Sequence, residues 1–99
     1  MVYMMANFKS VHVRITGIVQ GVFYRVSTQE KAIELGLSGW VANCDDGSVE
    51  ALFEGPYSQI QTMIQWCFQG PINSIVDNVV ILDSKGCTNL QEGFYIRYD

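Results

Sequence analysis

A short run between a predicted strand and a predicted helix carries the residues best suited to chemistry. It holds two glycines and an arginine, Gly17, Gly21 and Arg25. Glycine reaches backbone angles closed to residues with a Cβ, so the loop can curl until several N–H groups point into one concavity. A helix starting at Tyr24 or Arg25 would add its free N–H groups and the positive end of its dipole. The run therefore predicts an oxyanion site, with Arg25 as a planar fork able to hold two phosphate oxygens.

The segments on either side of this run predict the elements that hold it. Residues 11–16 alternate apolar and polar side chains, the period of a half-buried strand. Residues 25–36 predict a helix that ends at Gly36. Three apolar residues are expected on its core side: Val26, Ile33 and Leu37. Four polar residues are expected outside: Thr28, Gln29, Glu30 and Lys31.

The rest of the chain completes the fold class. Residues 39–43 and 49–54 predict two strands, joined by an Asp46-Gly47 pair that favours a tight hairpin. A second helix is predicted between Pro56 and Gly70. Apolar residues recur there at spacings of three and four residues: Ile60, Met63, Ile64, Cys67 and Phe68. Residues 78–83 and 94–98 predict the last strands. This order predicts an α+β, ferredoxin-like sandwich, βαββαβ with an added edge strand, in which an antiparallel sheet carries two helices on one face.

Composition limits the kind of protein and its partners. The chain has 99 residues and is 48% hydrophobic, which suits one domain with a core. No linker or repeat divides it, so residues 1–99 are expected to form a single domain with a core of about 8–98. The formal charge is −4 and the six Lys and Arg residues form no run, which argues against a nucleic-acid partner. No apolar stretch approaches the roughly 18 residues of a membrane span, and the opening six residues show no targeting pattern.

The cysteines and the histidine argue against a metal site. Cys44, Cys67 and Cys87 are odd in number and far apart, which favours free thiols in a reducing compartment. His12 alternates with strand residues and is read as a surface side chain. A dispersed set of this kind is not typical of zinc ligands. We therefore expect a cytoplasmic protein without a zinc site or a membrane partner. A small domain without an obvious unpaired apolar stripe is expected to be a monomer.

Two motifs in sequence order make the chain resemble the acylphosphatase family. The first reads Gly17-x-Val19-Gln20-Gly21-Val22-x-x-Arg25. The second reads Leu35-Gly36-Leu37-x-Gly39-Trp40-Val41-x-Asn43, followed by Asp46-Gly47-x-Val49-Glu50. Length, element order and the pairs Gly55-Pro56 and Gly70-Pro71 agree as well. The resemblance covers about residues 8 to 98, and two ordered motifs are far more specific than a lone glycine loop.

The resemblance implies an activity and a set of site residues. The activity is hydrolysis of the carboxyl-phosphate bond of acyl phosphates by water, giving a carboxylate and inorganic phosphate without metal or cofactor. Arg25 resembles the family's phosphate-binding arginine, and Asn43 resembles the asparagine that positions the attacking water. The phosphate would also be bound by backbone N–H groups of the loop: Gln20, Gly21, Val22, Phe23, Tyr24 and Arg25. Besides a small acyl phosphate substrate, inorganic phosphate or sulfate is expected as a ligand of this site.

Three positions depart from the family pattern. Tyr24 stands where phenylalanine is usual, so its hydroxyl needs a partner. Ala42 replaces a larger polar residue and removes a surface or substrate-facing contact. Cys44 replaces a frequent threonine, and a weak S–H donor then takes the place of a hydroxyl that could orient Asn43.

Other interpretations remain open at this level. Arg25 could be a solvated helix residue and Asn43 an Asx residue that organises the hairpin. The whole chain could be a catalytically silent anion-binding module, like the acylphosphatase-like domain of a larger maturation enzyme, although its free-standing length argues against this. A ferredoxin-like nucleic-acid or metal-binding domain is disfavoured by the acidic charge and the lack of a ligand cluster.

Overall fold

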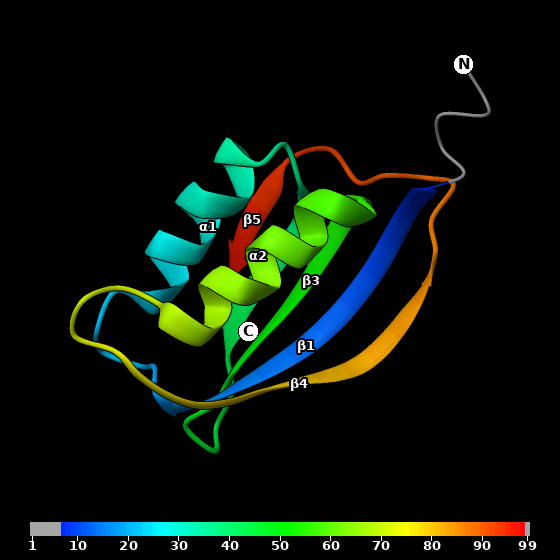
Figure 1. The fold of residues 1–99 in the computed structure, drawn as a ribbon. Coiled ribbons are helices and arrows are strands. Elements are labelled where there is room, and N and C mark those ends of the chain that lie inside the picture. The colour runs from blue at the N-terminus through cyan, green and yellow to red at the C-terminus, as the bar shows by residue number, and fades with distance from the viewer. Residues whose placement is uncertain (1–6, 99) are drawn as a thin grey trace.

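The computed structural model describes residues 7–98 of the chain. Residues 1–6 and residue 99 lie outside the described residues. The single domain expected over residues 1–99 is therefore described from residue 7 to residue 98 only. The elements follow the predicted order (Figure 1): β1 (Phe8–Ile18), α1 (Tyr24–Glu34), β2 (Ser38–Asn43), β3 (Val49–Pro56), α2 (Tyr57–Gln69), β4 (Ile75–Gly86) and β5 (Phe94–Arg97).

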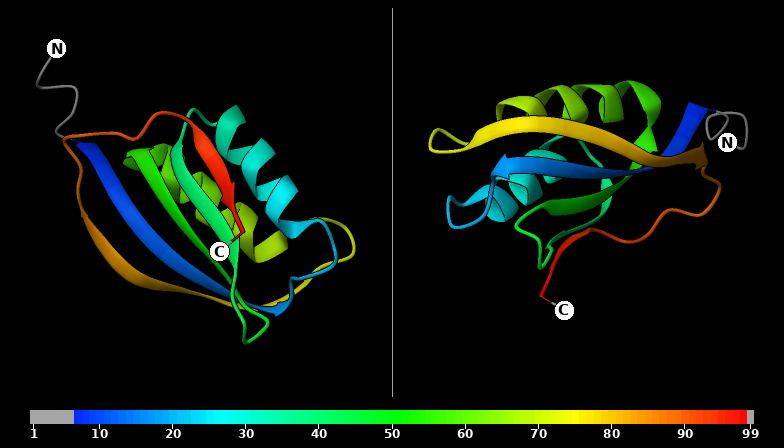
Figure 2. Two further views of the ribbon diagram at one scale, coloured as in Figure 1. Left: turned by 180° about the vertical axis from the view of Figure 1, so that it is seen from behind. Right: turned by 90° about the horizontal axis from the view of Figure 1, so that it is seen from below.

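The strands form one sheet in the order β4-β1-β3-β2-β5, and both helices lie on the same face of it (Figures 1 and 2). The predicted ferredoxin-like fold class is confirmed. One pairing differs from the expected antiparallel sheet, because β5 runs parallel to β2. The end of β4 and the start of β2 lie at the same end of the sheet. A connection that crosses this end therefore lets β5 start beside the start of β2.

The core lies between the sheet and the two helices. β1 and β3 each turn an alternating apolar row toward the helices, as their sequences predicted, and α2 packs its own row against them. The fully buried members of these three rows are Val11, Val13, Ile15, Val49, Ala51, Phe53, Ile60, Met63 and Cys67. Burial of each large apolar side chain contributes about 1.5–3 kcal/mol. The packing of this layer fixes the positions of the strand ends and of the helix end that form the candidate site.

The predicted core face of α1 is correct at Leu37, which follows the helix and is buried, but wrong at Val26 and Ile33. Val26 and Ile33 are 45% and 58% exposed, whereas Tyr24, Thr28 and Ala32 are buried. Thr28 can face the core because its hydroxyl donates to the carbonyl oxygen of Tyr24 at 2.7 Å. A buried hydroxyl with a local acceptor costs little, so a pattern of apolar residues alone selects the wrong side of this helix.

The role predicted for Gly17 also needs correction. Gly17 lies within β1, not in the loop, and a Cβ at this position would stand 2.1 Å from the carbonyl oxygen of Ile75. The close approach of β4 therefore requires glycine here. The pairing of β1 with β4 shifts register twice, between His12 and Val13 and between Thr16 and Gly17. Both strands are longer than predicted because this pairing continues beyond both ends of the predicted ranges.

Candidate active site

The loop between β1 and α1 has an unusual backbone. Gly21 has a φ of 75°, as its place in the motif led us to expect. Phe23 has a φ of 64° and is the one residue other than glycine in the described part of the chain with a positive φ. Such an angle is strained for a residue with a bulky side chain, and strain of this kind gathers at functional sites. The sequence placed Phe23 among the phosphate-binding residues but did not predict its positive φ, because glycine is the residue expected at such an angle.

The start of α1 offers unpaired backbone donors. Phe23 is the residue that precedes the helix, and no side chain caps the N–H groups of the first turn. The first intrahelical bond from beyond this turn runs from the N–H of Ser27 to the carbonyl oxygen of Phe23, at 3.0 Å. The N–H groups of Tyr24, Arg25 and Val26 thus have no helical acceptor. Together with the positive end of the helix dipole, they make this end of α1 suitable for an anion.

A pocket of about 250 Å³ lies at this end of the helix. Its lining comes from the loop, the first turn of α1 and the end of β2: Val19, Gln20, Gly21, Phe23, Tyr24, Arg25, Val26 and Asn43. All the expected site residues are in this set except Val22, which packs against the core. The fold thus brings Arg25 and Asn43 together although 17 other residues separate them in the sequence.

Arg25 and Asn43 differ in how they are held. The guanidinium carbon of Arg25 lies 5.1 Å from the ring centroid of Tyr98, close enough for a cation–π contact. The side-chain oxygen of Asn43 is buried and has no hydrogen-bond partner among the described residues. A buried polar atom of this kind costs free energy unless it is matched by a donor. Its position in the pocket suits an acceptor for a bound molecule with an O–H group.

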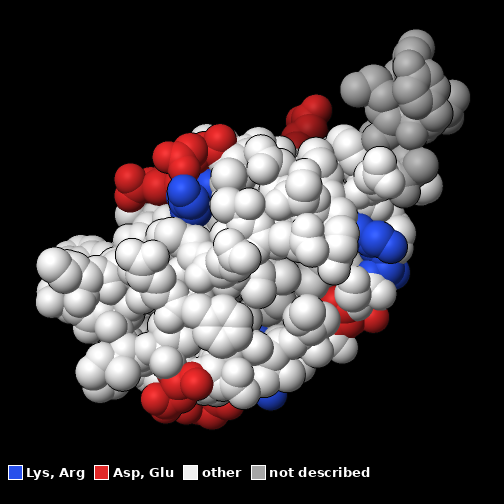
Figure 3. All heavy atoms as spheres, in the orientation of Figure 1, with Lys and Arg blue, Asp and Glu red and all other residues white. Residues whose placement is uncertain are grey.

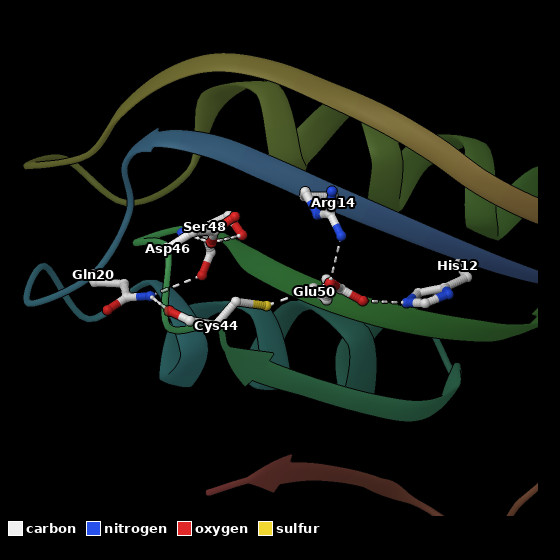
Figure 4. Close-up of polar contacts among 7 residues, drawn as sticks. All are labelled: His12, Arg14, Gln20, Cys44, Asp46, Ser48 and Glu50. Carbon is white, nitrogen blue, oxygen red and sulfur yellow. Dashed lines mark hydrogen bonds and ion pairs between the residues drawn. The ribbon is translucent and has the colours of Figure 1, made fainter. Parts of the chain in front are cut away.

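Gln20 holds the loop to the hairpin between β2 and β3, a role that we did not predict. Its side-chain amide nitrogen donates to the carbonyl oxygens of Cys44 and Ser48, each at 2.8 Å (Figure 4). Both N–H groups of the amide are therefore used within the protein. The sequence shows Gln20 only as a polar residue between Val19 and Gly21, and its partners lie 24 and 28 positions further on.

The hairpin itself is a closely bonded turn. The N–H of Cys44 donates to the carbonyl oxygen of Ser48 at 2.8 Å. One carboxylate oxygen of Asp46 accepts from both the N–H and the hydroxyl of Ser48, at 2.9 and 2.6 Å. These two bonds hold the pKa of Asp46 below its usual value. The turn-forming role predicted for this acidic residue agrees with its contacts, and the Asx role considered for Asn43 belongs to Asp46.

Two of the three departures from the family pattern, Tyr24 and Cys44, have clear contacts. The hydroxyl of Tyr24 is buried and donates to the carbonyl oxygen of Cys67 at 2.7 Å, which supplies the expected partner. Burial raises the pKa of Tyr24, and it raises the pKa of the Cys67 thiol to about 12. The thiol of Cys44 donates to Glu50 at 3.4 Å and does not take over a threonine's contact with Asn43. Burial raises the pKa of Cys44, so this thiol stays protonated near neutral pH.

Charge and metal-binding groups are sparse around this site. Within residues 7–98, no group of three or more His, Cys, Asp and Glu side chains is placed to hold a metal ion. In the same residues, no helix is long and apolar enough to cross a membrane. On the face shown in Figure 3, Lys and Arg are scattered at the rim and form no patch. Of the described residues that line the pocket, Arg25 is the one with a formally charged side chain.

Comparison with known proteins agrees with this geometry. The model of the acylphosphatase family matches residues 11–96, which include the loop, the first turn of α1 and the end of β2. The chain belongs to the acylphosphatase family. An acylphosphatase of Haloquadratum walsbyi is 47% identical over 88 residues, covering 87% of this chain and 90% of that relative. An acylphosphatase of Roseiflexus sp. strain RS-1 is 45% identical over 92 residues, covering 93% and 98%.

Solved acylphosphatase structures share the fold. The acylphosphatase of Coxiella burnetii superposes with a TM-score of 0.85 at 35% identity, covering 98% of this chain and all of that one. The acylphosphatase of Bacillus subtilis gives a TM-score of 0.86 at 32% identity, covering 91% and 99%. The protein is therefore an enzyme of the acylphosphatase type, a hydrolase that acts on the carboxyl-phosphate bond of acyl phosphates.

Proposed function

We propose that the pocket at the start of α1 binds the phosphoryl group of an acyl phosphate, and that Asn43 aims the attacking water at its phosphorus. In this proposal the guanidinium of Arg25 and the backbone N–H groups of residues 20–25 hold the phosphoryl oxygens. The observation that carries it is that Arg25 and Asn43 line one pocket, and that the buried side-chain oxygen of Asn43 has no hydrogen-bond partner in the described part of the chain. An anion needs fixed donors and a water needs a fixed acceptor, and this pocket offers both.

The reaction requires few further catalytic groups from the protein. An acyl phosphate already carries a good leaving group, so orientation and charge stabilisation supply most of the acceleration. Asn43 is a neutral acceptor and does not repel the anionic phosphate as a carboxylate would. Among residues 7–98, no Asp, Glu or His side chain lines the pocket. We therefore assign the proton of the water to an oxygen of the substrate's own phosphoryl group, and we expect a rate that is flat across neutral pH.

We further propose the setting in which this activity operates. The small size of the domain suits a monomer. The three cysteines are free thiols, which suits the reducing cytoplasm. Inorganic phosphate or sulfate would occupy the site in place of the substrate, and neither a metal nor a cofactor takes part.

The decisive experiment compares wild type with Asn43→Ala on benzoyl phosphate. We expect wild type to hydrolyse it, and Asn43→Ala to lose about 10²-fold in kcat, the scale of one preorganised hydrogen-bonding group. Inhibition by inorganic phosphate should stay the same, because Arg25 and the loop are intact. The matched control is Asn89→Ala, an exposed asparagine in the segment between β4 and β5. A variant that loses only substrate affinity at full kcat would remove the water-positioning role.

A further inference from the structure

The aromatic ring of Tyr98 lies beside the guanidinium of Arg25, although the two residues come from opposite ends of the chain. Tyr98 directly follows β5, and its ring centroid is 5.1 Å from the guanidinium carbon. Of these two residues, Arg25 lines the pocket and Tyr98 does not. The ring therefore contacts the arginine from outside the proposed phosphate site, where it can hold the cation without touching the phosphate.

The pairing of β5 with β2 explains how Tyr98 reaches the start of α1. Val41 on β2 is paired with Ile96 on β5, and both side chains belong to the core side of the sheet. Residues two apart in a strand point to the same face. Asn43 and Tyr98, each two residues further on, therefore point to the helix face as well. Because the two strands are parallel, both residues lie at the same end of the sheet.

A second contact fixes the same strand against the same helix. The side-chain amide of Gln29 donates to the carbonyl oxygen of Phe94 at 3.0 Å. Gln29 follows Arg25 by four residues, so both lie on one side of α1. Phe94 begins β5, is buried and stacks on Phe53 with a centroid distance of 5.7 Å. The strand is thus held at its first residue, and its far end meets the helix where Arg25 stands.

An aromatic ring is a suitable support for a phosphate-binding arginine. Arginine has a long side chain with many rotamers, and fixing one of them when phosphate binds costs conformational entropy. A contact that already favours the bound orientation lowers this cost. The ring attracts the cation through its face and adds no negative charge. The full charge and the N–H donors of the guanidinium therefore stay available for the phosphoryl oxygens.

The exposure of Tyr98 argues against a role in folding. Its side chain is 79% exposed. An exposed ring buries little apolar surface, so its removal should cost the fold little. The function of this side chain can therefore be measured in a folded enzyme.

We propose that Tyr98 is a positioning residue, whose ring holds the guanidinium of Arg25 in the orientation that receives the phosphoryl group. Tyr98 does not touch the substrate and acts only through Arg25. This inference rests on the proposed function and adds to it a residue from the end of β5.

Replacement of the ring tests the proposal. Tyr98→Leu keeps an apolar side chain but has no aromatic face. We expect kcat/KM for benzoyl phosphate to fall and the Ki of inorganic phosphate to rise, each about two- to fivefold, the scale of an exposed cation–π contact. Tyr98→Phe keeps the ring and should match wild type. Tyr95→Leu is the matched control, because Tyr95 is an exposed tyrosine of β5 that points to the opposite face of the sheet.

A double-mutant cycle shows whether Tyr98 acts through Arg25. In the Arg25→Ala background, Tyr98→Leu should leave kcat/KM unchanged, because the cation that the ring holds is gone. A residue with an independent effect would lower kcat/KM by the same factor in both backgrounds. Urea unfolding of each variant shows that the compared enzymes are equally folded.

The outcomes separate this inference from the proposed function. Wild-type constants in Tyr98→Leu would overturn the positioning role and leave the phosphate site standing. The same loss from Tyr98→Leu with and without Arg25 would also overturn it, as would a Tyr98→Phe enzyme as impaired as Tyr98→Leu. Full activity of Arg25→Ala would instead overturn the proposed function.

Discussion

The loop at residues 19–23 and the hairpin at residues 44–48 meet at the same pocket, yet they are built in opposite ways. The loop exposes backbone donors, and two of its residues have a positive φ. The hairpin uses its backbone and side-chain groups internally, through the bonds of Cys44, Asp46 and Ser48. The comparison suggests that the proposed phosphate site relies on main-chain N–H groups of the loop that the described residues leave open. The proposed water site instead relies on the hairpin, whose internal bonds fix the position of one side chain, Asn43.

Gln20 connects these two regions. It belongs to the loop, and both its hydrogen bonds end on carbonyl oxygens of the hairpin. In the proposed mechanism, the distance between the phosphate and the attacking water depends on the position of the loop relative to the hairpin. A side chain that fixes this distance contributes to catalysis without touching the substrate.

The largest effect is expected from removing the cation at the loop end. Arg25→Ala should lower the rate of benzoyl phosphate hydrolysis by about 10²- to 10³-fold, because a preorganised donor to the phosphoryl oxygens is lost. Arg25→Lys should not restore the rate, since an ammonium lacks the two-pronged geometry. Lys31→Ala, in the same helix and paired with the exposed Glu34, is the matched control and should retain full activity. A fully active Arg25→Lys enzyme would show that charge alone suffices.

A smaller loss is expected when the link between the two regions is cut. Gln20→Glu replaces two N–H donors with oxygens that face the carbonyls of Cys44 and Ser48. We expect kcat to fall about tenfold and the free energy of unfolding to fall by about 1–3 kcal/mol. Inhibition by phosphate should change less than kcat, because the loop amides and Arg25 remain. Gln61→Glu, exposed on α2, is the control.

An unchanged kcat in Gln20→Glu, together with the loss of stability, would mean that the link is structural only. Kinetics with benzoyl phosphate and urea unfolding of the same preparation separate these results.

The strained backbone of the loop should appear as a difference in stability. Phe23 is 77% exposed, so its side chain contributes little burial to the fold. Phe23→Val should lower the free energy of unfolding by about 1 kcal/mol, because a β-branched residue resists a positive φ. Phe23→Gly should not lower it, since glycine adopts this angle without strain. Equal losses in both variants, measured by urea unfolding, would show that the ring matters more than the backbone angle.

The smallest expected effect is a change in stability on substitution of Glu50, which lies near the start of β3. Burial opposes its charge, but bonds with Arg14, Cys44 and His12 outweigh burial, and its pKa in the folded protein lies below the usual 4.5. Its contribution to stability is therefore fully present above pH 4.5. That contribution is lost as the pH falls through the folded pKa. Glu50→Gln should be less stable than wild type at pH 7, by no more than about 1 kcal/mol, and the gap should narrow below pH 4.5. Thermal unfolding at several pH values tests this, with Glu92→Gln as control; a gap that is constant with pH would contradict it.

The order of the elements could be predicted because each has a clear period and clear ends. The alternation in β1 and β3 and the turn residues at Asp46-Gly47 are local signals, and the structure agrees with them. The buried side of α1 could not be predicted, because Thr28 is buried through a hydrogen bond that no scale of hydrophobicity records. The parallel pairing of β5 could not be predicted either, because it depends on where the preceding strand ends.

The candidate site could likewise be predicted from the sequence only in part. Arg25 and Asn43 were proposed from motifs and a family resemblance, since periodicity alone gives no reason for them to meet. The strained angle of Phe23 and the bonds of Gln20 depend on contacts with the hairpin, which no local pattern encodes. Ala42 lies between Glu50 and Arg97 in the register of three strands, and the linear sequence does not show this arrangement.

The register shifts between β1 and β4 have a consequence for how the protein behaves at high concentration. β4 is twelve residues long, stands at the edge of the sheet and exposes Val80, Ile81 and Leu82. A straight strand of this kind would offer a continuous template for another chain and favour aggregation. The bulges at the two shifts bend β4 and interrupt its row of free donors and acceptors. The irregular pairing thus protects the sheet from growing by addition of further molecules.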